Sequence, residues 1–316
     1  MKKIFLLWIL LSGSALAQTY PSKPIRYIVP FPPGGSADLI SRAIAPRLSE
    51  QLGQPVVVEN LPGAGAMLGV ERVAKSAPDG YTIGLAAAGA LSSNIHLYAR
   101  MPFDPEKDLT HITPLALIPF FLIAHPSQAS SIKNLIEEAK AKPGALSYGA
   151  GGNGSTMHLA GELFNMLGHV NIQVIPFKGS GPVSVAVLGN QVPYGVVDVP
   201  AAIANVRAGK LRALAVTSKQ RVSAAPDVPT FEEAGVPGYE AVGWFGVVGP
   251  AGLPNGILTR LNQEMAAALA TPEMRKTAID AGTEPYTTSP QEFTAMIRAE
   301  TKKWGAVIKA GNIKLD

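Results

Sequence analysis

Residues 31–38, Phe31-Pro32-Pro33-Gly34-Gly35-Ser36-Ala37-Asp38, decide the fold of this chain. They lie between an apolar, strand-like run, Ile25 to Val29, and a segment of helical spacing that begins near Ser36. The order is a strand, a Gly-rich turn and a helix N-terminus, where the first amides have no partner within the helix and carry the positive end of its dipole. Such a turn can hold an anion, with Ser36 capping the helix and the amides of Gly34, Gly35 and Ala37 free for an oxyanion.

A second turn of the same design occupies Gly149-Ala150-Gly151-Gly152-Asn153-Gly154-Ser155-Thr156. Its glycines match G-x-G-x-x-G, but the ribose-binding acid expected about 20 residues onward is missing, since Gln173 and Val174 occupy that region. Ser155 and Thr156 instead place hydroxyls at a helix start, which suits a carboxylate. Because open α/β folds bind ligands at the carboxyl edges of parallel strands, the two turns predict two lobes that hold one acidic solute.

Strands and helices alternate along the rest of the chain, which predicts an α/β fold of two lobes, each with a mostly parallel sheet. Lobe 1 is expected to comprise residues 18–119 and 242–316, and lobe 2 residues 120–241. Apolar residues 241–248 would return the chain to lobe 1, so that a two-strand hinge allows closure around a ligand. Residues 102–114 are expected to be irregular, and terminal helix 290–310 is expected to pack on lobe 1 or on lobe 2.

The first residues have the pattern of a secretory signal peptide. Lys2 and Lys3 precede an apolar run over residues 4–11, and Ala15-Leu16-Ala17 supplies an A-x-A cleavage site. We expect residues 1–17 to be removed, leaving a mature chain that begins at Gln18. No later segment offers about 20 uninterrupted apolar residues, and the chain has no cysteine for disulfides, thiolate metal sites or lipid attachment. These features predict a free periplasmic protein.

Charge and motif content argue against several functions. The formal net charge of +4 falls to +2 once Lys2 and Lys3 are removed, and the remaining charges are dispersed rather than gathered into basic runs, so nucleic acid is not an expected partner. The histidines lack H-x-x-x-H spacing, and no G-x-x-x-x-G-K-[ST] segment occurs. We therefore expect no metal site, no nucleotide hydrolysis and no cofactor.

Four single residues have two interpretations each. Asp38 is either a favourable charge in the first turn of its helix or an acceptor for an amino group or a bound water. Lys178 faces either the cleft or the solvent, and Asp198 either binds ligand or water at a sheet edge or caps the helix that follows. His158 stands three residues after Ser155, which permits a Ser–His pair, but no orienting carboxylate or oxyanion group is evident from the sequence.

Short segments spread over the whole mature chain form a recognisable pattern. They are residues 30–35 (PFPPGG) with Asp38, Glu59-Asn60 with 62–65 (PGAG), 78–82 (PDGYT), 176–179 (PFKG), 211–216 (LRALAV), 226–230 (PDVPT) and 244–246 (WFG). On these segments the chain resembles the extracytoplasmic solute receptors of tripartite tricarboxylate transporters, often called the Bug family after Bordetella uptake genes.

The resemblance implies a type II periplasmic-binding-protein fold without catalysis, and a carboxylate-bearing solute held between the lobes by the two turns. The receptor would act as a monomer and hand its solute to membrane permease subunits. Together with the interpretations above, the expected ligand-binding residues are Phe31, Pro32, Pro33, Gly34, Gly35, Ser36, Ala37, Asp38, Ala88, Gly152, Asn153, Gly154, Ser155, Thr156, His158, Lys178 and Asp198.

One segment departs from the family pattern. In residues 87–95 (AAGALSSNI), which include Ala88, relatives often place more hydroxyl or His side chains and a Pro after the Asn. This departure argues against citrate-like ligands and favours an aromatic or short aliphatic mono- or dicarboxylate. Two other functions stay open at this point: a periplasmic sensing subunit for a signalling system, and a hydrolase of carboxylate esters that depends on Ser36 or Ser155.

Overall fold

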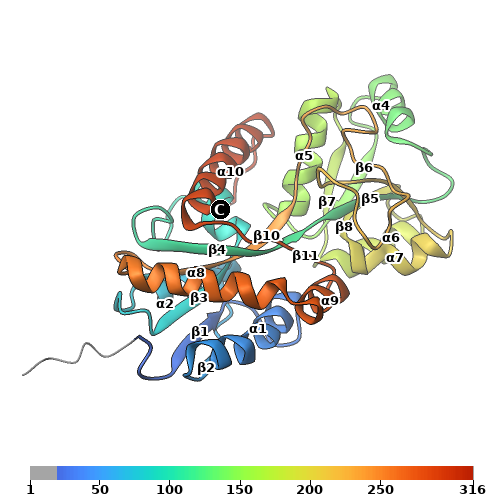
Figure 1. Cartoon of the computed structure of the whole chain (residues 1–316). Helices are drawn as coiled ribbons and strands as arrows, with labels where there is room; N and C mark the ends of the chain where they lie inside the picture. Colours follow the sequence, from blue (N-terminus) through green and yellow to red (C-terminus); the bar gives the residue numbers. More distant parts are fainter. Residues whose placement is uncertain (1–19, 316) are drawn as a thin grey trace, which may run out of the picture.

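The computed structural model describes residues 20–315, which form two lobes, each built on one β-sheet covered by helices (Figure 1). The two-lobed α/β architecture expected from the sequence is therefore confirmed. The proposed signal peptide, residues 1–17, and the proposed start at Gln18 lie outside the described residues.

Each lobe has a sheet of its own. The six-stranded sheet of the first lobe has the order β11-β4-β10-β3-β1-β2, and the five-stranded sheet of the second has the order β7-β6-β8-β5-β9. The strands of the first are β1 (Ile25–Val29), β2 (Val56–Asn60), β3 (Thr82–Ala87), β4 (Leu109–Ile118), β10 (Gly243–Pro250) and β11 (Glu284–Pro285). Those of the second are β5 (Phe120–Ala124), β6 (Ser147–Ala150), β7 (Gln173–Pro176), β8 (Tyr194–Asp198) and β9 (Arg212–Val216).

Both sheets are mixed rather than mostly parallel, which corrects one detail of the expected fold. β1 pairs in parallel with β2 and β3, and β6 pairs in parallel with β7 and β8. β10 runs antiparallel to β3 and β4, and β5 runs antiparallel to β8 and β9. The reason is the hinge: β4 leaves the first lobe and β10 returns to it beside β4, so their directions are opposed.

The hinge consists of two crossings that lie close together. β4 ends at Ile118 and β5 begins at Phe120, so only Pro119 separates the strands of the two lobes. β4 begins at Leu109, inside the segment expected to be irregular, and continues through Pro114. The register against β10 shifts where Gly246 faces Pro114. Proline has no N–H to donate to a neighbouring strand. The shift in register lets β4 continue through Pro114 without that hydrogen bond.

Helices cover both sheets. Around the first sheet lie α1 (Ser36–Leu52), α2 (Met67–Ala74), α8 (Asn255–Ala270) and α9 (Pro272–Asp280), with the short elements η1 (Ala64–Ala66), η2 (Gly89–Ser93) and α3 (Asn94–Leu97). Around the second lie α4 (Ile132–Ala141), α5 (Thr156–Gly168), α6 (Ser180–Leu188) and α7 (Val199–Arg207). α1 runs on through Pro46 to Leu52, and Gly53, whose φ is +70°, forms its C-cap.

The terminal helix α10 (Pro290–Ala310) packs on both lobes, a choice that the sequence left open. Its first half buries Phe293 and Ile297 in a core cluster of the first lobe with Trp244. Its second half buries Trp304 and Val307 in the main core of the second lobe. Figure 1 shows the helix lying over β4 and running toward α5. Movement of one lobe against the other must therefore bend or slide this helix.

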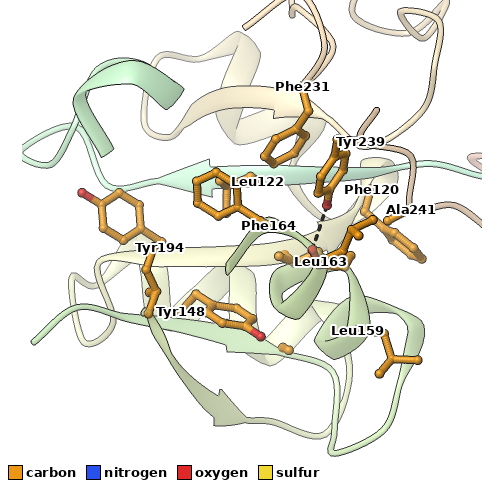
Figure 2. Close-up of a cluster of buried hydrophobic side chains, with 14 of the residues drawn as sticks. Phe120, Leu122, Tyr148, Leu159, Leu163, Phe164, Tyr194, Phe231, Tyr239 and Ala241 are labelled. Atoms are coloured by element: carbon orange, nitrogen blue, oxygen red, sulfur yellow. Dashed lines mark hydrogen bonds between the residues drawn. The ribbon is translucent and has the colours of Figure 1, made fainter. Parts of the chain in front are cut away.

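The core of the second lobe fixes the position of α5. The ring of Tyr239 stacks on Phe231 with 3.9 Å between the ring centres, and the Tyr239 hydroxyl donates to the carbonyl of Ala160 in α5 at 2.9 Å (Figure 2). Gly161 allows a further close approach, because a Cβ there would lie 2.2 Å from the ring of Tyr148. The N-terminus of α5 is thereby held against β6, the strand that precedes the second Gly-rich turn.

Candidate functional site

A cavity of about 820 Å³ opens between the two lobes, and both Gly-rich turns line it. The first lobe contributes Phe31 and Ser36, and an apolar wall at 87–90 that includes Ala88. The second lobe contributes the turn 151–157 and Asp198. Both Gly-rich turns and Ala88, which the sequence singles out, therefore line one cavity.

Besides the short helix α3, which starts at Asn94, four longer helices begin at this cavity. Ser36 of α1, Thr156 of α5, Ser180 of α6 and Ala201 of α7 all line it. Within residues 20–315, no hydrogen-bond partner is found for the amides of residues 36–38 in α1, 156–157 in α5 or 180–181 in α6. Each set carries the positive end of a helix dipole, so together they form a positive surface made of backbone rather than of side chains.

The side chains around the cavity add no positive charge. Among the described residues that line it there is no Lys or Arg, and Asp198 is the one charged side chain. Lys178, expected as a possible contact, does not line the cavity and is exposed in the turn before α6, so its solvated interpretation is the correct one. Any anion bound here must therefore be held by amides and hydroxyls.

The first turn is built differently from the expectation in two respects. Gly35, not Ser36, is the N-cap of α1, and Ser36 is the first helical residue. The amide of Gly34 is not free, because it donates to Oδ2 of Asp38 at 3.0 Å. Of the predicted residues of this turn, only Phe31 and Ser36 line the cavity, whereas Pro32, Pro33, Gly34, Gly35, Ala37 and Asp38 do not.

Asp38 is a structural acceptor rather than a ligand contact. It is 3% exposed, and besides Gly34 it accepts hydrogen bonds from Nε of Arg42 at 3.0 Å and Nδ2 of Asn60 at 2.8 Å. Burial opposes ionisation of the carboxyl, but the three donors outweigh it and hold the pKa of Asp38 below its ordinary value. Arg42 and Asn60, which sequence reasoning missed, therefore complete the support of this turn.

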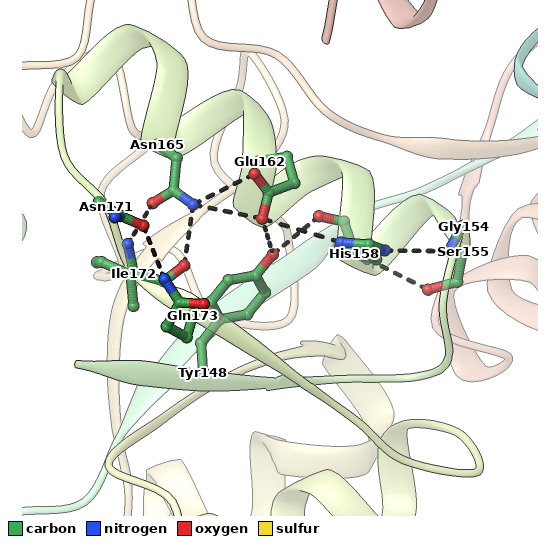
Figure 3. A network of polar contacts seen from close by, with 9 residues as sticks. All are labelled: Tyr148, Gly154, Ser155, His158, Glu162, Asn165, Asn171, Ile172 and Gln173. Carbon is green, nitrogen blue, oxygen red and sulfur yellow. Dashed lines mark hydrogen bonds and ion pairs between the residues drawn. The ribbon is translucent and has the colours of Figure 1, made fainter. Parts of the chain in front are cut away.

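In the second turn, as in the first, a glycine amide donates to a side chain of the following helix, but here the acceptor is neutral. The amide of Gly154 donates to Nδ1 of His158 at 3.0 Å, again four residues further on, and Ser155 caps α5 by accepting from the amide of His158 at 3.2 Å (Figure 3). His158 is 5% exposed and lies behind the turn, outside the cavity lining. It is therefore not a direct ligand contact. Ser155 and the His158 ring do not form a nucleophile–base pair, which removes the geometric basis for ester hydrolysis at Ser155.

Further polar groups lie behind His158. Nε2 of His158 is 3.8 Å from Oε1 of Glu162, and the Tyr148 hydroxyl donates to the same oxygen at 3.1 Å (Figure 3). Burial lowers the pKa of His158 and raises the pKa of Glu162. His158 is thus neutral at neutral pH, with Nδ1 as the acceptor and its proton on Nε2.

Asp198 ends β8 and immediately precedes α7, but its side chain makes no capping hydrogen bond. Its amide donates to Oγ of Ser180 at 3.1 Å, which ties it to the start of α6. Burial raises the pKa of its carboxyl. The start of α6 was missed as part of the site, although Gly179, with φ +100°, repeats the order of strand, glycine turn and helix after β7.

Aromatic rings close one side of the cavity. Phe31 meets Phe245 edge-on with 5.8 Å between ring centres, and both line the cavity. Phe31 therefore stands where a ligand contact was expected. Trp244 is fully buried in the core, and Leu315 near the C-terminus also lines the cavity beside Gly154.

The chain matches a family of transport receptors and is similar in sequence to known proteins. Residues 40–313 match the model of the tripartite tricarboxylate transporter family receptor. Protein BugT of Bordetella pertussis is 38% identical over 301 residues, which cover 95% of this chain and 92% of that protein. No helix among residues 20–315 has both the length and the apolar character needed to cross a membrane.

Solved structures agree with the sequence match. R. palustris Rpa4515 with adipate has a TM-score of 0.78 and 36% identity, covering 94% of this chain and 100% of that one. MatC from Rhodopseudomonas palustris with bound malate has a TM-score of 0.74 and 30% identity, covering 92% and 100%. The periplasmic binding protein BugD has a TM-score of 0.74 and 32% identity, covering 94% and 100%. The chain therefore belongs to the tripartite tricarboxylate transporter family receptors, the family that its sequence pattern resembles.

Proposed function

We propose that this protein is a periplasmic receptor that binds a small carboxylate in the cavity between its lobes and delivers it to membrane permease subunits. The observation that carries the proposal is the convergence of unpaired amides, at the starts of α1, α5 and α6, on one cavity whose described lining residues include no Lys or Arg. Relatives with adipate and malate support a carboxylate as the solute. We keep as a proposal the bounds 18–119 and 242–316 for lobe 1 and 120–241 for lobe 2, with the terminal helix α10 packing on both lobes.

The amides can supply the required affinity. A hydrogen bond to a charged group contributes about 1.5 to 3 kcal/mol. Five such bonds, less roughly 4 kcal/mol or more for the freedom lost on association, reach the approximately 8 kcal/mol of micromolar binding. The contacts that we assign to the solute are the amides of residues 36 and 156–157, the side chains of Phe31, Ser155 and Thr156, and the backbone of residues 152–153.

A thermal-shift and calorimetric screen of carboxylic acids, with the matching amides and alcohols as controls, tests the proposal. A ligand that binds the native state raises the melting temperature by mass action. We expect shifts with acids and not with their neutral analogues. Equal responses to acids and amides would show that the cavity does not recognise a carboxylate.

Proline substitution tests the amides individually. Ser36→Pro removes the first helical N–H of α1 at a position where proline is well tolerated, and Gly35 before it has the extended backbone that proline requires. Ser36→Ala removes the hydroxyl and keeps the amide, so it is the matched control. We expect the Kd for a carboxylate to rise about tenfold in Ser36→Pro relative to Ser36→Ala. Thr156→Pro and Thr156→Ala form the same pair in α5.

Delivery to a permease is tested in cells. A deletion strain should lose uptake of the carboxylate identified in the screen, and uptake should return with the wild-type gene but not with Thr156→Pro. Normal uptake combined with a lost transcriptional response to that carboxylate would instead identify a sensing subunit.

A further inference from the structure

Asp198 places a carboxyl group in a cavity that we assign to an anion. It is the one charged side chain among the described lining residues, and it shares the cavity with the free amides of α1, α5 and α6. An acidic residue at this position disfavours a second negative charge nearby, because two like charges in a partly buried site repel each other.

The carboxylate of Asp198 has acceptor capacity that the chain leaves unused. Ser180 supplies the neighbouring hydroxyl, but its one proton also has Sδ of Met157 as an acceptor at 3.1 Å, whereas a carboxylate has about four acceptor positions. The side chain makes no hydrogen bond to the start of α7, although Asp198 stands at the N-cap position. No Lys or Arg among the described lining residues compensates its charge. The remaining acceptor positions of Asp198 are therefore available to hydrogen-bond donors of a molecule bound in the cavity.

On the basis of the proposed function, we infer that the solute carries, besides its carboxylate, a hydroxyl or amino group that donates a hydrogen bond to Asp198. The carboxylate lies at the starts of α1 and α5, and the donor group points to the floor of the second lobe, where β8 ends and α6 and α7 begin. Asp198 is then a specificity-determining residue, and the preferred solutes are hydroxy- or amino-carboxylates rather than doubly ionised dicarboxylates.

Matched ligands test this inference by calorimetry at pH 7.5. Butanoate, 4-hydroxybutanoate, 4-aminobutanoate and succinate share one carbon chain and differ only in the terminal group. The same comparison is made with three-, five- and six-carbon chains, and with benzoate, 4-hydroxybenzoate and 4-aminobenzoate, so that the result does not depend on one ligand length. In the series that binds best, we expect the hydroxy or amino acid to bind about tenfold more tightly than the parent acid and the dicarboxylate.

Asp198→Asn is the informative variant because it removes the charge and keeps the shape. We expect it to reduce the hydroxy-over-parent and amino-over-parent ratios to about threefold or less, and to strengthen dicarboxylate binding. Asp198→Ser serves as a second variant, and the unliganded melting temperature shows whether each variant is folded.

The possible failures are distinguishable. If carboxylates bind but the ratios are near one, or are unchanged in both folded variants, the role of Asp198 is wrong and the carboxylate receptor stands. If no acid in any series binds, the proposed function fails and this inference fails with it.

Discussion

The backbone amide of Gly154 donates a hydrogen bond to Nδ1 of His158, 3.0 Å away (Figure 3). The amide of Gly34 makes the equivalent bond to Oδ2 of Asp38, also at 3.0 Å. Each Gly-rich turn is thus tied to a side chain in the first turn of the helix that it precedes. This hydrogen bond uses one amide and orients the turn, while the first helical amides, those of Ser36 in α1 and of residues 156–157 in α5, stay unpaired at the cavity. We expect both acceptors to be positioning residues.

His158 variants test the tie in the second turn. His158→Asn keeps an acceptor near the position of Nδ1, whereas His158→Gln moves it to the position of Nε2 and His158→Leu removes it. Leaving the Gly154 amide without a partner costs about 1 to 3 kcal/mol of stability. We expect the Leu and Gln variants to lose this stability in urea unfolding and to bind the carboxylate about fivefold or more weakly. Wild-type affinity in both, with only Asn altered, would contradict the positioning role.

The same tie predicts a pH dependence. Burial lowers the pKa of His158 below its ordinary value of 6.5, so the unfolded chain binds more protons in the window just below pH 6.5. The contribution of His158 to stability is therefore complete above pH 6.5 and falls as the pH drops toward the lower, folded pKa. Thermal melts between pH 8 and 5 should show a smaller loss on acidification for His158→Asn than for the wild type.

Two other buried groups, Glu162 beside His158 and His111 in the first lobe, serve as controls for that experiment. Burial raises the pKa of Glu162, so its contribution has the opposite sign and is lost as the pH rises through the folded value. Glu162→Gln should therefore make the loss on acidification steeper. His111 also has a pKa lowered by burial, but it lies in the first lobe between Thr294 and Pro105. His111→Asn should change stability and leave the pH dependence of ligand affinity unchanged.

The sequence locates the two turns because their pattern is local. A strand, a glycine turn and a polar helix start occupy adjacent residues, and the geometry of such a unit depends little on the rest of the chain. The same pattern at the start of α6 is harder to recognise, because β7 ends in Pro176 and is only four residues long.

The predictions that the structure corrects concern features that depend on distant residues or on side-chain placement. The direction of β10 follows from the return of the chain to the first lobe. The position of Pro114 inside β4 follows from the register of β10 against β4. Whether an amide at a helix start is free depends on whether the side chain of Asp38 or His158 folds back to it. Residue type permits this contact without requiring it, so the sequence placed both residues in the ligand set.

Glycine substitutions separate strain from ligand contact. Gly154 has φ +71°, and a Cβ there would lie 2.6 Å from Cδ1 of Leu315. Gly35 has an extended backbone, with no atom within 4 Å of the position of a Cβ. We expect Gly154→Ala to lower stability by about 1 to 2 kcal/mol and to weaken binding, because both the turn and Leu315 must move. Gly35→Ala, its matched control, should keep wild-type stability; an equal loss in both would show that the strain is not located at Gly154.

Asp38 provides a last prediction, on stability at low pH. Its three donors hold the folded pKa below the ordinary value, so its contribution is present at neutral pH and is lost as the pH falls through the folded pKa, below about pH 4. Asp38→Ala leaves the Gly34 amide, Arg42 and Asn60 without this acceptor and should cost about 3 kcal/mol or more in urea unfolding at pH 7. Asp38→Asn keeps one acceptor oxygen and should cost less.

Because Arg42 also donates to Asn60 at 2.7 Å, a double-mutant cycle of Asp38→Asn with Arg42→Gln should show coupling at pH 7. Additive losses would mean that the charge of Asp38 is not paired with Arg42, and that the first turn is held by the neutral hydrogen bonds alone.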